Sequence, residues 1–386
     1  MQAVVFTDEA LREQAGRFVW LEIDTDKAQN APFAQKFDLR ALPTYYVLDP
    51  RTEQAILKWV GGATVPQFLG LLNDARANFE RVRAGESAAG AGDADAVLTQ
   101  ADLLYGEGST SDAIERYEEA LALAPEGWPQ YARAVQGLVL ALSIEGQPAR
   151  GAALARDALP RLSGTTAAVV AGVGLDCAVM LPDDDPEKAP LVQRFEAAVH
   201  EALADERLVI ADDDRSGLYI SLLSAREAAG DSTGERQALE TWSAFLETAA
   251  ERAPNPEART VFDSHRLWAY LGLGVPEKAI PMLEQSSRDF PDDYNPHARL
   301  ATIYKAMQRW DDALAASDRA VERGYGPRLV SMLGTRADIL VAKGDTASAR
   351  ATIVDALARA DALPEGQRSE QRVAGLRKKL ESLGGG

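Results

Sequence analysis

The sequence has little of the chemistry on which redox and metal sites depend. Its 386 residues include one cysteine, Cys177, and three histidines. A single cysteine excludes any disulfide within the chain, which is consistent with a reducing compartment. His200, His265 and His297 are scattered, and no pair of them has the spacing of a metal site. The sequence therefore predicts neither a metal nor an organic cofactor.

Long apolar runs and clustered positive charge are also missing. No apolar run approaches the roughly 20 residues that a membrane helix requires. The formal net charge of −18 argues against nucleic acid as a partner, because phosphate binding needs clustered lysine and arginine. The same charge argues against an anionic membrane surface. No lysine-bearing phosphate loop and no Gly-x-Ser-x-Gly turn occurs, so nothing in the sequence supports a kinase or a hydrolase.

Two short acidic runs precede segments with helical periodicity. They are Asp183–Asp185 and Asp212–Asp214. Acidic residues at helix starts usually cap the helix and interact with its dipole. Both runs lack the glycine and glutamate positions of a calcium loop, so we expect helix starts and no metal site.

Most of the chain after residue 93 has the periodicity of helices separated by short glycine turns. In one copy, Gly108 precedes an alanine, an aromatic residue and a second alanine at Ala113, Tyr117 and Ala120. The alanines of two later copies, Ala279 and Ala313, stand 34 residues apart. Copies of the turn and helix lie near the following residues: Gly274, Trp310 and Gly344, with weaker copies near Gly146 and Gly230.

This pattern resembles the tetratricopeptide repeat, a helix–turn–helix unit of about 34 residues. Small residues let two antiparallel helices approach closely, and each pair needs neighbours to bury its apolar face. The resemblance covers residues 94–358 and is strongest over 97–126 and 260–358; between 160 and 258 we expect helix pairs of irregular length. Ser369–Leu383 is predicted to be a capping helix, with charged outer positions at Arg372, Arg377, Lys378 and Lys379.

The first segment of the chain mixes strands with helices. The predicted strands are Phe18–Asp24, Leu39–Asp49 with Pro43 near its start, and Ile56–Gly62; the predicted helices are Ala31–Phe37 and Val65–Leu72. This order resembles the back part of a thioredoxin-like domain, in which a first strand and a paired-cysteine motif precede this material. Met1 stands where the helix after the motif should already be running, and Thr7 or Asp8 is the expected N-cap of the next helix.

The missing cysteine pair leaves two explanations open. Either the chain starts at an internal methionine, with the first strand and the motif upstream of Met1, or the domain is degenerate. Truncation is favoured, because a thioredoxin-like sheet without its first strand would have an unpaired central edge. No secretory signal is visible, so the predicted location is cytoplasmic for the chain as given and periplasmic if a signal sequence precedes Met1.

The predicted architecture therefore has two folded parts. An α/β thioredoxin-like partial domain occupies residues 1–83, and a linker of small residues occupies 84–93. An all-α tetratricopeptide superhelix, or α-solenoid, occupies 94–363, followed by the capping helix and tail at 364–386.

Both resemblances imply places where a peptide would bind. In thioredoxin-like domains the proline at the start of this strand is cis and the adjoining backbone pairs with substrate, which implies Leu42, Pro43 and Thr44 as peptide-binding residues. The alternative is that Pro43 only shapes a turn. In tetratricopeptide repeats the first helix of each unit lines a groove, which implies the following positions: His265, Trp268, Arg299, Thr302, Lys305 and Asp338.

The type of ligand stays open at this point. Tryptophan and arginine are frequent anchors for a bound peptide, but Trp268 can equally pack between repeats. The groove positions do not reproduce the lysine and asparagine clamp that some repeat proteins use for C-terminal carboxylates.

Two functions agree with these features. The first is a protein-interaction scaffold, with a protein or peptide partner in the repeat groove and a thioredoxin-like domain that is redox-inactive. The second is a thiol-disulfide oxidoreductase whose Cys-x-x-Cys lies upstream of Met1 and whose repeats recruit substrates. The chain as given cannot carry out the second chemistry, which needs two thiols. Cys177 lies in an apolar helical context and is predicted to be structural.

Overall fold

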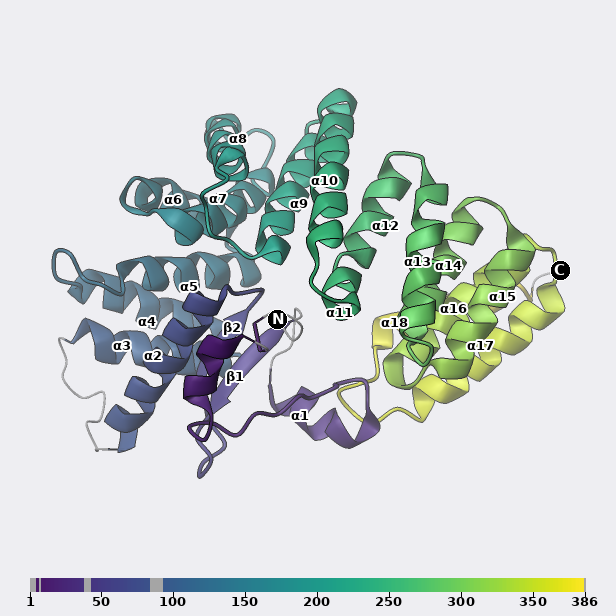
Figure 1. Cartoon of the computed structure of the whole chain (residues 1–386), viewed down its shortest axis with the longest axis horizontal. Coiled ribbons are helices and arrows are strands. Elements are labelled where there is room, and N and C mark those ends of the chain that lie inside the picture. Colours follow the sequence, from purple (N-terminus) through teal and green to yellow (C-terminus); the bar gives the residue numbers. More distant parts are fainter. Residues whose placement is uncertain (1–4, 7, 38–42, 84–92, 385–386) are drawn as a thin grey trace. The chain divides into compact units, whose positions relative to one another are not determined.

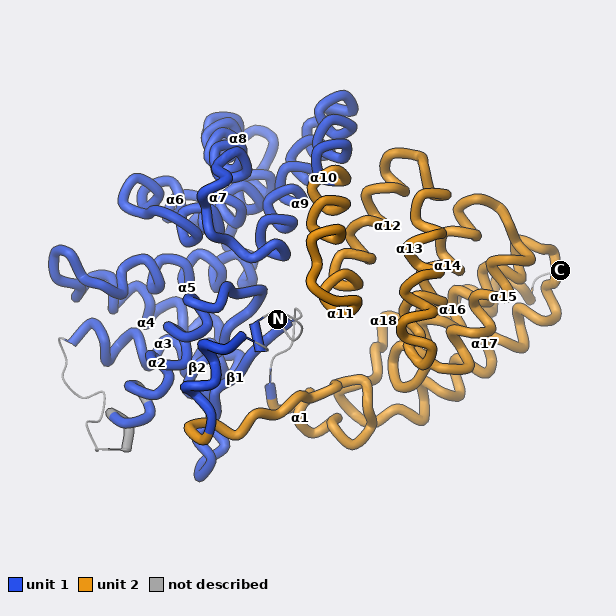
Figure 2. Tube along the Cα trace, viewed as in Figure 1, with its two compact units in different colours: residues 1–15, 37–242 blue, residues 16–36, 243–386 orange. Residues whose placement is uncertain are grey.

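The computed structural model describes residues 5–6, 8–37, 43–83 and 93–384. They form two compact units, shown in different colours in Figure 2. The first unit contains residues 1–15 and 37–242, and the second contains residues 16–36 and 243–386. Each unit is described by itself below.

The first unit contains a β-hairpin followed by a helix. Strands β1 (Thr44–Leu48) and β2 (Ala55–Val60) are antiparallel, with Thr44 opposite Val60 and a register shift at Leu48. The Gly61 amide donates to the Pro43 carbonyl at 3.0 Å, which closes the open end of the hairpin. Helix α2 (Val65–Arg83) follows.

The structure agrees with some of the predictions for the N-terminal segment and contradicts one of them. Helix α1 (Ala31–Lys36) lies where a helix was expected, and Asp8 caps the 3-10 helix η1 (Glu9–Gln14) by accepting from the Ala10 amide. The strand predicted at Phe18–Asp24 is wrong, since these residues form no strand beyond an isolated bridge at Phe18. Val19 and Leu21 are 88% and 76% exposed, because no neighbouring strand in the described chain covers them.

Some predictions on the N-terminal segment lie outside the described residues. They concern the N-cap expected at Thr7, the start of the predicted strand at 39–42 with Leu42, and linker positions 84–92. The sheet formed by the described residues has two strands, which does not establish a thioredoxin-like fold. The proposed boundary between the first segment and the repeats therefore stays a prediction.

The remainder of the first unit consists of helix pairs (Figure 1). Gly108, at φ +84°, makes the turn of the first pair, and Ala113, Tyr117 and Ala120 are buried as the repeat pattern predicts. The pairs are α3 (Ala94–Gly106) with α4 (Thr110–Leu123), α5 (Tyr131–Ile144) with α6 (Pro148–Ala158), α7 (Gly164–Val179) with α8 (Lys188–Ala204), and α9 (Asp212–Ala228) with α10 (Ser232–Arg252), which continues into the second unit.

The second unit continues the same pattern. Ala279, Ala313 and Ala349, which occupy equivalent positions in the repeat pattern, are each 0% exposed, as expected for small residues between paired helices. The helices are α11 (Pro256–Thr260), α12 (Asp263–Gly272), α13 (Ala279–Asp289), α14 (Tyr294–Ala306), α15 (Trp310–Arg323), α16 (Gly326–Ala342), α17 (Thr346–Asp361) and α18 (Glu370–Ser382). Short 3-10 helices are η2 (Ala28–Asn30) and η4 (Pro276–Lys278) here, and η3 (Leu159–Arg161) in the first unit.

Strand β2 packs against the first helix of the N-terminal repeats. Gly106 at the end of α3 makes this possible, because a Cβ there would lie 2.9 Å from the Cβ of Ala55. The Lys58 ammonium lies 4.7 Å from the centre of the Tyr105 ring of α3. The hairpin thus covers part of α3, the first helix of the N-terminal pair.

A buried polar network holds the helices beneath the hairpin. Asp102 of α3 accepts a 2.8 Å hydrogen bond from the Tyr117 hydroxyl of α4 and pairs with the Arg133 guanidinium of α5. Asp74 of α2 lies 3.9 Å from Arg133. Burial raises the pKa of Asp102, and Arg133 together with the Tyr117 hydrogen bond opposes that rise. The network connects four helices and leaves its central carboxylate fully partnered.

The end of the hairpin also contacts the start of α9. The Gly62 amide donates to the Asp214 carboxylate at 3.2 Å. Burial and, to a lesser extent, the neighbouring Asp213 charge raise the pKa of Asp214 to about 6, while the hydrogen bond from Gly62 opposes this rise. The acidic run at 212–214 therefore occupies the first helical turn of α9, as predicted, and one of its members also binds the hairpin.

We expect Arg133→Met to destabilise the first unit by about 3 kcal/mol, because it leaves the buried Asp102 carboxylate without its cation. Adding Asp102→Asn should recover about half of that loss, since the uncompensated charge is then removed. Urea unfolding followed by circular dichroism measures both. Arg150→Met, which removes an exposed ion pair with Glu118, is the control and should cost about 0.5 kcal/mol or less. An equal effect of the two arginine variants would contradict the network's role.

We expect Asp214→Asn to stabilise the protein at about pH 7.5 by roughly 3 kcal/mol and to have little effect at about pH 4. The pKa of Asp214 is higher in the folded state than in the unfolded state. The protonated carboxyl group therefore favours folding below the unfolded-state pKa, and this contribution to stability is lost as the pH rises through about 6. The asparagine oxygen still accepts from Gly62 and never ionises. Unfolding of both proteins across this pH range tests the claim, with the exposed Asp184→Asn as control. A pH-independent difference would rule it out.

Candidate functional site

The candidate site is the face formed by the first helices of the C-terminal repeats. The predicted groove residues lie on three of these helices: His265 and Trp268 on α12, Arg299, Thr302 and Lys305 on α14, and Asp338 on α16. We call this set the first-helix face. Ion pairs show that part of it is contiguous, because the Lys305 ammonium lies 4.0 Å from the Asp338 carboxylate.

Lys379 of α18 belongs to the same face. Its ammonium forms an ion pair with Asp338. Lys379, predicted to be an outer position of the capping helix, is half-buried, whereas Arg372, Arg377 and Lys378 are exposed. Arg377, Lys378 and Lys379 are consecutive basic residues, so the sequence does not show which of them contacts the repeats. The packing of α18 against α16 shows that it is Lys379.

Arg299 of α14 is a cation of this face with unused hydrogen-bonding capacity. Its guanidinium is half-buried and has no hydrogen-bond or ion-pair partner within the described part of the chain. Loss of hydration lowers the pKa of Arg299, and the charge of Asp263 opposes this. A guanidinium in this state can bind a carboxylate in a two-pronged geometry without first breaking another ion pair.

Asp263 lies beneath this region on α12. It is 1% exposed, and its Oδ2 accepts a 2.6 Å hydrogen bond from the Ser286 hydroxyl of α13. Burial raises the pKa of Asp263, and Ser286 lowers it together with nearby arginines that include Arg299. Asp263 therefore places a buried carboxyl group near Arg299 without pairing directly with it.

The other predicted groove residues differ in availability. Trp268 is 49% exposed, so half of its large apolar surface faces solvent. His265 is partly exposed. The Thr302 hydroxyl donates to the Ala298 carbonyl of its own helix at 3.1 Å. The ring of Trp268 and the cations of α14 are thus the accessible chemistry of this face.

The second predicted peptide site, at the start of β1, is only partly described. The Pro43 carbonyl accepts from Gly61 within the hairpin, and Thr44 faces Val60 across the strands. Both interactions belong to the hairpin itself. Peptide binding at Leu42, Pro43 and Thr44 stays a prediction.

No redox or metal chemistry emerges from the described residues. Cys177 is buried, and burial raises its pKa to about 11, so its thiol is not ionised at neutral pH. Within the residues that the structure describes, no group of three histidine, cysteine, aspartate or glutamate side chains could hold a metal ion. None of the described helices is long and apolar enough to cross a membrane.

Several solved structures resemble the chain at low identity. A tetratricopeptide repeat protein from Parabacteroides merdae is 10% identical, with 75% of this chain and 98% of that chain covered and a TM-score of 0.48. The TPR2AB domain of yeast Sti1 in complex with an Hsp90 peptide is 18% identical, with 75% and 98% covered and a TM-score of 0.29. A signal transduction ATPase with a tetratricopeptide repeat sensor from Pyrococcus horikoshii is 12% identical, with 75% and 52% covered and a TM-score of 0.39.

The family comparison points to one segment of the chain. No curated protein matches the sequence. Residues 270–335 match the family model described as the tetratricopeptide repeat. The match runs from the end of α12 into α16 and contains the pair α14 and α15 with its buried Ala313. This chain therefore carries tetratricopeptide repeats in residues 270–335.

Proposed function

We propose that the chain is a protein-interaction scaffold whose first-helix face binds an extended peptide of a partner protein. The observation that carries this proposal is the unpaired, half-buried Arg299 on the helix next to the exposed Trp268. Tryptophan and arginine are the residue types that contribute most binding energy at protein interfaces. Stacked helical repeats present their first helices as an extended binding surface.

The charge of this face favours an acidic peptide. Arg299, Lys305 and Lys379 contribute three positive charges, against the Asp338 carboxylate on the face and the Asp263 carboxyl group buried beneath it. The whole chain carries a net charge of −18, so this local excess of positive charge is unlike the average surface. Opposite charge steers a partner to its site and fixes its orientation. We infer that a carboxylate of the peptide pairs with Arg299 while an apolar side chain packs on Trp268.

In this proposal the hairpin and α2 are the remnant of a thioredoxin-like domain and have no redox role. An oxidoreductase would need a Cys-x-x-Cys outside the given sequence. Reading the DNA upstream of Met1 tests that alternative. An in-frame pair of cysteines would support the oxidoreductase, and its absence would leave the scaffold.

We expect Arg299→Gln to weaken the binding of acidic peptides by about tenfold or more, because the charged hydrogen bonds to the carboxylate are lost. An array of acidic and charge-neutral peptides, followed by fluorescence anisotropy on the strongest binder, provides the measurement. Trp268→Ala should weaken the same peptide. Arg319→Gln, an exposed arginine on the second helix α15, is the matched control.

The salt dependence of binding separates this mechanism from apolar binding alone. Affinity for the wild type should fall as salt rises, and the fall should be smaller for Arg299→Gln. If Arg299→Gln and Arg319→Gln bound the peptide equally well, the proposed site would be wrong.

A further inference from the structure

An acidic turn of the second unit lies against the starts of α14 and α16. The turn consists of Asp24–Lys27 and is called the acidic turn below. The Tyr325 hydroxyl donates to Asp24 at 2.6 Å, and the Arg328 guanidinium lies 3.2 Å from Asp26. The Tyr294 hydroxyl lies 3.5 Å from the same Asp26 oxygen. The repeats thus bind both carboxylates of the turn.

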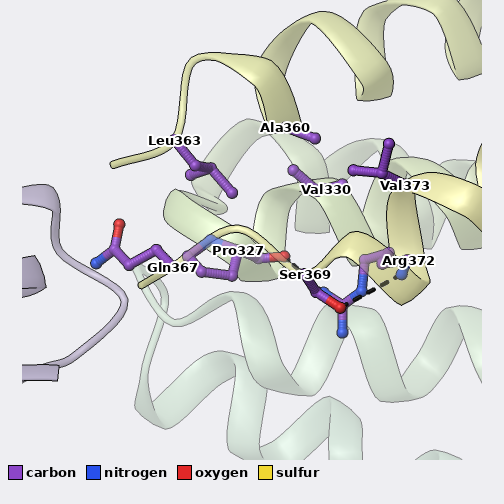
Figure 3. Close-up of a pocket in the computed structure, with 8 residues that line it drawn as sticks. All are labelled: Pro327, Val330, Ala360, Leu363, Gln367, Ser369, Arg372 and Val373. Atoms are coloured by element: carbon purple, nitrogen blue, oxygen red, sulfur yellow. Dashed lines mark hydrogen bonds between the residues drawn. The ribbon is translucent and has the colours of Figure 1, made fainter. Parts of the chain in front are cut away.

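The backbone of the acidic turn is bound as well. The Gln367 amide nitrogen donates to the carbonyls of Thr25 and Lys27 at 2.7 and 3.0 Å. Gln367 is 7% exposed, so its amide is held in a fixed place. Figure 3 shows this side chain extending from the pocket before α18 toward the N-terminal segment. The contacts described here involve the side chains of Asp24 and Asp26 and the carbonyl of Thr25, but not the Thr25 side chain.

The acidic turn has its own internal hydrogen bonds. Asp24 accepts from the Asp26 amide through its side chain at 3.0 Å and from the Lys27 amide through its carbonyl at 3.2 Å. The Asn30 side chain donates to the same carbonyl at 2.7 Å. A segment that is already turned loses less conformational entropy on binding.

The receiving surface is shaped to accept a backbone. A Cβ on Gly326 would lie 2.0 Å from the Asp26 carbonyl oxygen, so only glycine permits this approach. The Tyr294 and Tyr325 rings meet edge to face with centroids 5.7 Å apart, which places both hydroxyls on the acidic turn. Close backbone approach, two hydroxyl donors, one guanidinium and one buried amide together form a site that recognises a peptide.

We propose that Tyr294, Tyr325, Arg328 and Gln367 form a binding site for an Asp-x-Asp turn, which the chain fills with its own residues 24–27. Tethering gives the acidic turn an effective concentration in the millimolar range, so a modest intrinsic affinity keeps the site occupied. These four residues are distinct from Trp268 and Arg299, so the proposal stands separately from peptide binding on the first-helix face.

The test removes the acidic turn from its binding site by mutation and then adds the same sequence as a separate peptide. The full chain with Asp24→Asn and Asp26→Asn keeps the receiving residues but removes both carboxylates. The probe is a fluorescent peptide with the sequence of residues 20–31. The double variant should bind it at least about tenfold more tightly than wild type, whose site is occupied. Adding Tyr325→Phe and Arg328→Gln should abolish binding, and a peptide with both aspartates changed to asparagine should not bind.

Tryptic cleavage after Lys27, followed by mass spectrometry, shows whether the site has been emptied. Cleavage should be slow in wild type, because Gln367 holds the Lys27 carbonyl, and at least about tenfold faster in the double variant. Asp292→Asn, which changes an exposed aspartate of the same unit outside the acidic turn, is the control for an Asp→Asn change elsewhere and should be cleaved like wild type. Unchanged cleavage of the double variant would overturn the proposal, since the carboxylates would not hold the turn. Faster cleavage without peptide binding would overturn it too, because the contact would then be only part of the fold.

Discussion

A pair of antiparallel helices cannot bury its own apolar face, and the rest of this chain is arranged around that constraint. Alanines such as Ala113 and Ala313 bring the two helices of a pair together, and larger residues on the outer faces must then be covered by something else. A neighbouring pair covers most of these faces. At the end of the second unit, α18 covers the last pair with Val373 and Leu376.

The chain also uses non-repeat segments to cover the repeats. In the first unit, β2 packs on α3, and the buried Asp102 network lies beneath it. In the second unit, the acidic turn binds the starts of α14 and α16. In each unit a segment from the first 60 residues makes specific contacts with helices that come later in the sequence. The contacted helices α3, α14 and α16 are each the first helix of a pair.

Local patterns in the sequence were sufficient to predict the helix pairs. Alanine and aromatic spacing is repeated within one helix and its neighbour, and the turn glycines at 108, 146, 230, 274 and 344 all have positive φ in the structure. The strand expected at Phe18–Asp24 failed for a different reason. Alternating apolar residues favour a strand only when another strand is available to pair with it, and the described chain provides none there.

The long-range contacts of the candidate sites could not be predicted from local sequence patterns. The bond between Asp24 and Tyr325 joins residues about 300 positions apart, and neither belongs to a recognisable motif. The role of Lys379 is equally hidden, because its neighbours in sequence have the same charge. The groove positions on α12 and α14 follow from the resemblance to the repeat family and stay a prediction, whereas the lack of a hydrogen-bond or ion-pair partner for Arg299 within the described chain is visible only in the structure.

Hydrogen–deuterium exchange on the intact chain tests the central claim that non-repeat segments cover the repeats. If β2 is packed on α3, the amides of Ala55–Val60 should exchange nearly as slowly as those of α3, since both open in one cooperative step. The contrary result would be exchange of the β2 amides at least about a hundredfold faster than that of α3, which would mean that the hairpin opens freely while the repeat stays folded.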